Sequence, residues 1–71
     1  MKRDDAIEVW NRLEEAGLVV SLEHRVGAPA SRYVVEISPG VLSADELRLV
    51  ADQADKHEAE VAIALGSVTI R

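Results

Sequence analysis

The chain has 71 residues, a net charge of −5 at pH 7 and no cysteine. Its length allows one small domain spanning residues 1–71, and the missing cysteines exclude disulfides, thiolate metal sites and cysteine nucleophiles. The negative charge disfavours nucleic acid and anionic membranes as partners. The sequence has no signal-peptide pattern and no apolar run of about 18 residues, so we expect a cytoplasmic protein without a membrane segment.

The first predicted element is a helix that begins near Asp5. Asp5 and Glu8, three residues later, match a capping box. Gly17 should end this helix as the left-handed residue of a Schellman motif. We expect Trp10 to fill the space between this helix and the second one. Apolar residues recur at helical spacing and form one stripe: Ala6, Val9, Trp10, Leu13 and Ala16.

Two runs of alternating polarity follow, residues 18–26 and residues 32–38. They are joined by a loop rich in Gly and Pro, residues 27–31, and the pattern predicts a β-hairpin that Pro39 terminates. Alternation places one set of side chains on the inner face of this hairpin: Leu18, Val20, Leu22, His24, Val26, Tyr33, Val35 and Ile37.

A second helix is predicted from about residue 44 to residue 57. Ser43 and Glu46 form its capping box. Its apolar stripe is Leu47, Val50, Ala51 and Ala54, with Leu49 on the opposite side of the helix.

The last stretch, residues 60–71, changes the phase of its alternation at Gly66. A second hairpin with Gly66 and Ser67 in a type II′ turn explains this switch, and we favour that interpretation. A bulge at Gly66 within one long strand is the alternative.

The predicted order is therefore α-β-β-α-β-β. The two halves align without a gap across an offset of 41 residues, which leaves open a true duplication of a helix-hairpin unit. Each strand has one apolar face and each helix one apolar stripe. The sequence predicts an α+β fold, in which two helices pack on one face of an antiparallel sheet of three to four strands.

Enzyme signatures are absent from the sequence. It has no Gly-rich phosphate loop, no nucleophile elbow and no zinc-type histidine pair, so we expect a protein that is not an enzyme, with no catalytic residues and no cofactor. An acidic cluster surrounds the end of the second helix, but its side chains spread around the helix and predict no metal site. It consists of Asp52, Asp55, His57, Glu58 and Glu60.

The leftover apolar surface predicts a small acidic protein–protein interaction domain that self-associates, most simply as a homodimer. We expect the C-terminal strand, residues 68–71, to be a sheet edge that no proline or lysine guards, so that its free backbone groups can pair with a partner. The predicted interface residues are Val19, Val34, Leu49, Val68 and Ile70.

Two alternative functions stay open. The first is an acidic decoy or regulator, of the small type found in phages and bacteria, that docks on a basic protein surface through its acidic cluster. The second is an anion or nucleic-acid binder that uses the tip of the first hairpin. The residues of that predicted site are His24, Arg25, Arg32 and Tyr33, whose two arginines are few for nonspecific affinity.

Overall fold

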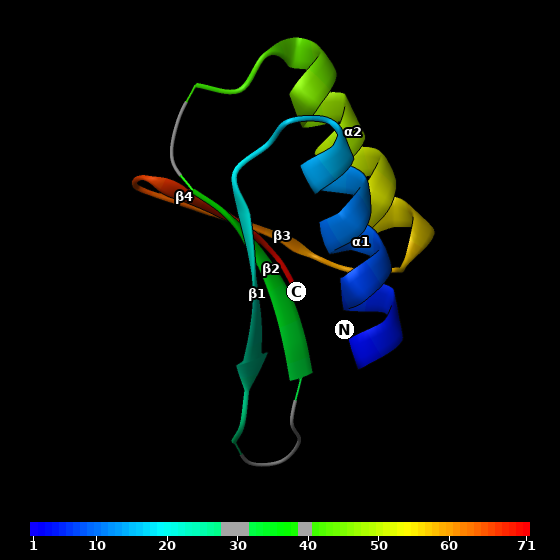
Figure 1. The fold of residues 1–71 in the computed structure, drawn as a ribbon. Helices are drawn as coiled ribbons and strands as arrows, with labels where there is room; N and C mark the ends of the chain where they lie inside the picture. The colour runs from blue at the N-terminus through cyan, green and yellow to red at the C-terminus, as the bar shows by residue number, and fades with distance from the viewer. Residues whose placement is uncertain (28–31, 39–40) are drawn as a thin grey trace.

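The computed structural model describes residues 1–27, 32–38 and 41–71. Its elements follow the order α-β-β-α-β-β, which confirms the predicted α+β fold with both helices on one side of one antiparallel sheet (Figure 1). The predicted loop residues 28–31 and the predicted strand stop at Pro39 lie outside the described residues. The elements are α1 (Arg3–Glu15), β1 (Val20–Arg25), β2 (Arg32–Ile37), α2 (Ala44–Lys56), β3 (Val61–Ala64) and β4 (Ser67–Ile70).

The sheet has the strand order β1-β2-β4-β3. Two hairpins, β1–β2 and β3–β4, meet through an antiparallel pairing of β2 with β4. At that junction Val35 lies opposite Ile70, and Ile37 lies opposite Val68. The C-terminal strand β4 is therefore inside the sheet, and the prediction that it forms an edge was wrong. Its second neighbour, β2, is distant in the sequence, so local patterning gave no sign of that pairing.

The two halves are related by an internal two-fold arrangement. Both ends of α2 lie 41 residues after the matching ends of α1, and β3 starts 41 residues after β1. The paired residues Glu36 and Thr69 lie at the centre of the β2–β4 junction, where the equivalent strands of the two halves run antiparallel. The 41-residue offset found in the sequence therefore holds in the structure for both helices and for the start of the first strand of each half.

The helix ends follow from local chemistry. Gly17 has φ +87°, and the Leu18 and Gly17 amides donate to the carbonyls of Leu13 and Glu14, which confirms the predicted Schellman motif. Ser43 and Glu46 form the predicted capping box. The predicted start at Asp5 was wrong, because α1 begins earlier, after Lys2, which makes no side-chain cap. The acidic residues of that first turn still lie at the positive end of the helix dipole.

α2 ends in the same way as α1 but without glycine. The Ala59 amide donates to the Ala54 carbonyl at 2.8 Å, and the Glu58 amide donates to the Asp55 carbonyl at 3.2 Å. This second Schellman arrangement requires a left-handed residue, and Glu58 takes that position with φ +52°. Glu58 is the equivalent of Gly17 in the second half, so a side chain here occupies a conformation that favours glycine.

The second hairpin is confirmed, and its turn lies one residue earlier than predicted. Ala64 pairs with Ser67, so Leu65 and Gly66 are the central residues of the turn, and the bulge alternative is excluded. Gly66 has φ +81° at the second central position, where a type II turn needs glycine, rather than at the first position of the predicted type II′ turn. This register places Ile63 opposite Val68.

The core lies between the helices and the inner face of the sheet, with α1 directly over β1 and β2. α2 is rotated relative to its predicted stripe: Leu47 is half exposed and Ala51 is exposed, whereas Leu49 packs against the core. The polar Gln53 is buried on this helix. Apolar periodicity missed this rotation because part of the buried stripe is polar. The fully buried side chains with the largest volumes are Leu13, Ile70, Val9, Val34 and Val35.

The chain end before α1 is tied to the sheet. The backbone nitrogen of Met1 donates to the Tyr33 carbonyl at 3.0 Å, and the Tyr33 amide donates to the Met1 carbonyl at 2.9 Å. Neither helix of the described residues is long and apolar enough to cross a membrane.

Candidate functional site

β3 is one edge of the sheet, and its hydrogen-bonding groups point away from the rest of the molecule at alternate residues. Glu60 and Arg71 exchange two backbone hydrogen bonds, at 3.0 and 2.9 Å. In an antiparallel ladder such pairs alternate with pairs that make no mutual bonds, so Ala62 bonds toward β4 while Val61 and Ile63 do not. The N–H and C=O groups of Val61 and Ile63 therefore face the free edge.

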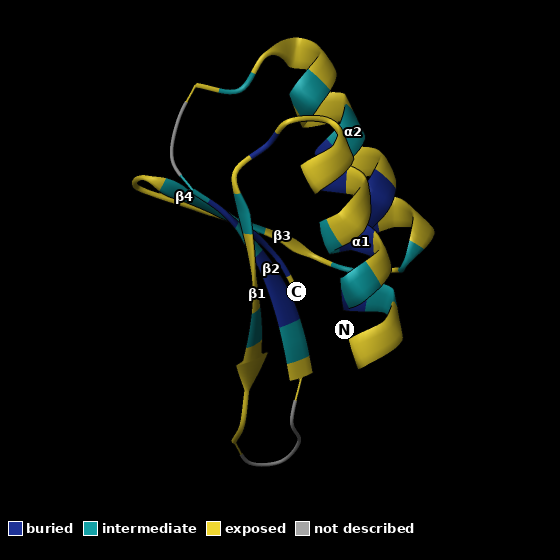
Figure 2. Cartoon of the chain, viewed as in Figure 1, coloured by how far each residue is buried: buried dark blue, intermediate teal, exposed yellow. Residues whose placement is uncertain are grey.

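The side chains of this edge are also exposed. Ile63 is 77% exposed and Val61 39% exposed, although both belong to the face of the sheet that carries the helices, and Leu65 at the turn is fully exposed. Figure 2 shows the β3–β4 hairpin exposed along β3, while β2 is buried along much of its length. We define the β3 surface as this free backbone edge together with the side chains of Val61, Ile63 and Leu65.

A comparison of the two halves explains the exposure of β3. In the first half, the Trp10 indole donates to the Val20 carbonyl at 3.4 Å, so the ring lies against β1. The prediction that Trp10 fills the space between the helices was therefore wrong. The equivalent residue on α2 is Ala51, which is too small to cover a strand and is itself exposed. The second half of the sheet thus lacks the aromatic cover of the first half.

A shallow cavity of about 180 Å³ adjoins the β3 surface. Its apolar walls come from β2, from the segment before α2, and from both strands of the second hairpin. The side chains that give it this character are Ile37, Leu42, Ile63 and Val68. The cavity therefore extends the apolar character of the β3 surface toward the core.

The predicted interface residues do not form one exposed surface in the structure. Val34 and Ile70 are fully buried within the single chain, Leu49 and Val68 are half-buried, and Val19 is 71% exposed. Neither Val34 nor Ile70 is on the surface where a partner could touch it. The exposed apolar edge is formed instead by residues of β3, which were not among the predicted interface residues.

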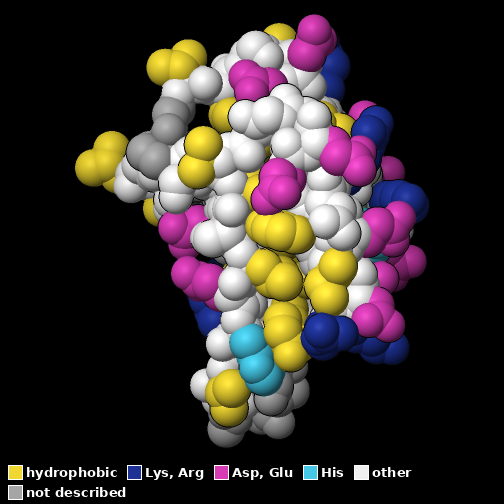
Figure 3. All heavy atoms as spheres, viewed as in Figure 1, with side chains coloured by type: hydrophobic (Ala, Val, Ile, Leu, Met, Phe, Trp, Pro, Cys, Tyr) yellow, Lys and Arg dark blue, Asp and Glu magenta, His cyan; other side chains and the backbone are white. Residues whose placement is uncertain are grey.

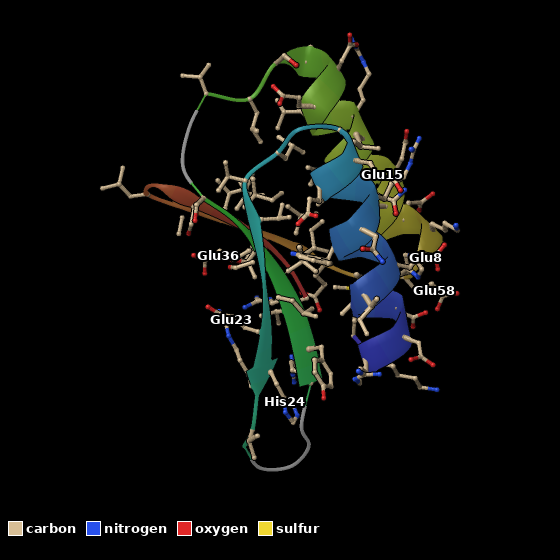
Figure 4. The ribbon with its side chains drawn as sticks, viewed as in Figure 1. Glu8, Glu15, Glu23, His24, Glu36 and Glu58 are labelled. Carbon is tan, nitrogen blue, oxygen red and sulfur yellow. The ribbon has the colours of Figure 1, made fainter. Side chains whose placement is uncertain are left out.

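Val34 is buried on the face of the sheet that faces away from the helices. The guanidinium of Arg25 lies 3.1 Å from Glu23 and 4.0 Å from Glu36, and Figure 4 shows both carboxylates on that side of the sheet. Val34 lies opposite Glu23 and two residues before Glu36 on β2, so this ion-paired group covers it. Polar side chains that cover a valine in this way leave no signal in the alternation pattern.

The predicted anion site is brought together only in part. His24 and Tyr33 stack with ring centroids 4.2 Å apart and nearly parallel planes, below an apolar band between β1 and α1 that Figure 3 shows. Arg25 lies across from Arg32 in the register, but its charge is engaged by Glu23 and Glu36. Arg32 is exposed and makes no ion pair with any residue that the structure describes. Successive side chains of a strand alternate between the two faces, so Arg32 lies on the opposite face of the sheet from His24 and Tyr33, and only the two rings of the predicted anion site come together.

The predicted acidic cluster divides into two parts. Asp52, Asp55, Glu58 and Glu60 are exposed, and the described residues give them no ion pair. His57 instead turns toward α1, where its ring is only 6% exposed and lies 3.2 Å from Asp5 and 3.6 Å from Glu8. Within residues 1–27, 32–38 and 41–71, no group of three or more His, Asp or Glu side chains could hold a metal ion.

Lys56 completes the contact between the helices. Its ammonium group donates to the Glu8 carboxylate at 2.7 Å, and this hydrogen bond, followed by the attraction between the charges, holds the pKa of Glu8 below its ordinary value. Polar side chains therefore connect α1 and α2, because the apolar stripes of the two helices do not fully face each other. Sequence spacing alone could not find this contact, since its partners are about 50 residues apart.

Comparisons of the chain with protein-family models, with curated proteins and with solved structures found no match.

Proposed function

We propose that this chain is a non-enzymatic protein-interaction domain that self-associates through its β3 surface. The observation that carries the proposal is an exposed sheet edge without any charged residue or proline along residues 61–65. Proteins normally guard such edges with charge, proline or a covering segment, because the free backbone groups otherwise pair with another strand. Pairing here would also remove apolar side chains from water.

The other edge of the same sheet supplies the contrast. β1 carries the charged residues Glu23 and Arg25 among its last three positions, and these charges guard it. Leu22, the equivalent of Ile63, is only 36% exposed, against 77% for Ile63. Full burial of a side chain the size of isoleucine contributes about 1.5–3 kcal/mol. Because Ile63 is largely exposed in the single chain, most of that stabilisation would be gained only when a partner buries it.

The test is the solution mass by light scattering at low and at high salt, for three chains. We expect the parent chain to be a dimer at both salt concentrations, because apolar contacts and backbone pairing are insensitive to screening. Ile63→Lys should be monomeric, and Leu22→Lys, a matched change on the opposite edge, should keep the dimer mass. Circular dichroism checks that both variants fold. A monomeric parent chain, or a dimeric Ile63→Lys, would overturn the proposal.

A second candidate is favoured by the exposed carboxylates at the end of α2. Asp52, Asp55, Glu58 and Glu60 carry charge that no described residue neutralises, which suits docking on a basic protein surface. Such binding should weaken steeply as salt rises, since exposed charges are screened. A parent chain that is monomeric at both salt concentrations, yet binds a basic protein only at low salt, would favour this function.

A further inference from the structure

We infer that two copies join β3 to β3 in antiparallel fashion with Ile63 on the two-fold axis, so that two four-stranded sheets become one continuous sheet. This inference rests on the proposed self-association and adds the occupant and the register of the β3 surface. It follows from three features of residues 61–65: which backbone groups are free, which side chains are large, and where the charges lie.

The free backbone groups restrict the register. Only Val61, Ile63 and the neighbouring odd-numbered residues direct their N–H and C=O groups outward, so an outward residue of one copy must lie opposite an outward residue of the other. A two-fold axis perpendicular to the sheet satisfies this condition and keeps the helices of both copies on the same side. Of the registers that meet this condition, the two centred on the strand place Ile63 opposite itself or Ala62 opposite itself, and the others leave more of β3 unpaired.

The side chains choose between these registers. Residues 61–65 read Val-Ala-Ile-Ala-Leu, large and small in strict alternation around Ile63. With Ile63 on the axis, Val61 lies opposite Leu65 of the second copy, and Ala62 lies opposite Ala64. Large meets large and small meets small at every position. With Ala62 on the axis, Leu65 lies opposite Ala59 and gains little, so the first register is favoured.

The alternation also argues that the occupant is a second copy. A strand that is symmetric about Ile63 is complementary to itself when reversed, as an isologous dimer requires. Pairing β3 with β1 of another copy would instead leave one β1 and one β3 free, which propagates an open filament. That pairing would bring the charged residues Glu23 and Arg25 against the apolar strand. Pairing of β3 with itself closes the assembly and leaves only the charged β1 edges.

The second copy also reaches the cavity beside Ile63. In this register Ile63 of the second copy lies directly opposite Ile63, and Val61 of the second copy lies opposite Leu65 at the hairpin end. The cavity of about 180 Å³ lined by Leu42 and Val68 is at that end of the hairpin. The dimer would therefore cover the apolar opening that a single chain leaves beside its core.

Single-cysteine variants test the register, since the chain has no cysteine of its own. With Ile63 on the axis, Ala62 and Ala64 of the second copy form a pair without mutual hydrogen bonds, with Cα atoms about 4.5 Å apart. That distance suits a disulfide, whereas two copies of the same residue 62 would be separated by more than about 7 Å, which does not. A mixture of Ala62→Cys and Ala64→Cys should cross-link on oxidation, and each variant alone should not.

Light scattering of the reduced variants separates the possible outcomes. A dimer whose mixture cross-links supports the inference. A dimer in which Ala62→Cys cross-links alone overturns the register, because it places Ala62 on the axis, while the proposed self-association stands. A dimer that never cross-links overturns the inferred register, and the mass of Ile63→Lys then decides whether the β3 surface is used at all. A monomer overturns the proposed function itself.

Discussion

The Trp10 indole donates a hydrogen bond to the Val20 carbonyl at 3.4 Å, and this contact marks the main difference between the two halves of the fold. The indole holds the start of β1 against α1, and its ring covers apolar surface that the second half leaves open. At the equivalent position of α2, Ala51 provides no ring and no donor for Val61. The difference between Trp10 and Ala51 thus separates the first half, whose strand is covered by the indole, from the second half, which presents an apolar edge.

Trp10→Ala should therefore destabilise the chain without removing its self-association. Truncating a fully buried tryptophan costs about 3–5 kcal/mol, and the partial burial of Trp10 reduces our expectation to about 2 kcal/mol. Urea unfolding at fixed protein concentration measures this loss. The matched control is Ala51→Gly, an exposed small residue on α2, which should cost only about 1 kcal/mol from helix propensity. A loss for Trp10→Ala no larger than that of the control would contradict the covering role.

Local chemistry made much of the fold predictable. Gly17 and the Ser43–Glu46 box mark one helix end and one helix start, and both act within a few residues of the backbone that they satisfy. The alternation of residues 18–26 and 32–38 predicted the β1–β2 hairpin that the structure shows. These signals are short in range, so a single sequence contains them completely.

The candidate site depends on relationships that are long in range. Whether β4 is an edge depends on its pairing with β2, and whether Ile63 is covered depends on the size of Ala51 and the rotation of α2. An alternating strand looks the same whether a helix covers its inner face or not. The predicted interface therefore included Ile70 and left out Ile63, whereas the structure buries Ile70 and exposes Ile63.

Glu58→Gly should stabilise the chain, because Glu58 holds the left-handed position that Gly17 holds in the first half. A side chain in this conformation costs about 1–2 kcal/mol, part of which glycine loses again through its greater freedom in the unfolded chain. We expect a net gain of about 0.5–1 kcal/mol in the free energy of unfolding. The reciprocal variant, Gly17→Glu, should lose a comparable amount. Thermal and urea unfolding of both variants measure these changes, and a destabilised Glu58→Gly would show that the Glu58 side chain has a role that outweighs its backbone strain.

Acidification should weaken the contact between Glu8 and Lys56. Because the hydrogen bond from Lys56 holds the pKa of Glu8 below its ordinary value of 4.5, the unfolded chain binds a proton there before the folded chain does. The contribution of this pair is therefore present above that ordinary value and is lost as the pH falls through the lowered pKa. Lys56→Met should flatten the decline in stability between about pH 5 and pH 3.

Arg48→Met is the matched control for this pH experiment. It removes the same charge from α2, but among the described residues Arg48 forms an ion pair with Asp45 of the same helix, at 2.8 Å, and with no residue of α1. Urea unfolding of the parent chain and both variants across the acid range gives the three slopes. If Arg48→Met flattened the decline as much as Lys56→Met, net charge rather than the Glu8 contact would account for the effect.

Proline substitution should separate backbone pairing at the β3 edge from simple burial of its side chains. The Val61 N–H faces the free edge, so Val61→Pro removes a donor that the single chain does not use. We expect this variant to keep its fold and to lose the dimer, because proline blocks an edge to further pairing. Ala62→Pro removes a donor directed at β4, and should unfold the second hairpin or cost about 3 kcal/mol or more. Circular dichroism, urea unfolding and light scattering distinguish the two results. A Val61→Pro chain that is folded and still dimeric would show that the two copies join without the backbone of β3. If Val61→Pro were unfolded and Ala62→Pro stable, the inward and outward backbone groups of β3 would have to be exchanged.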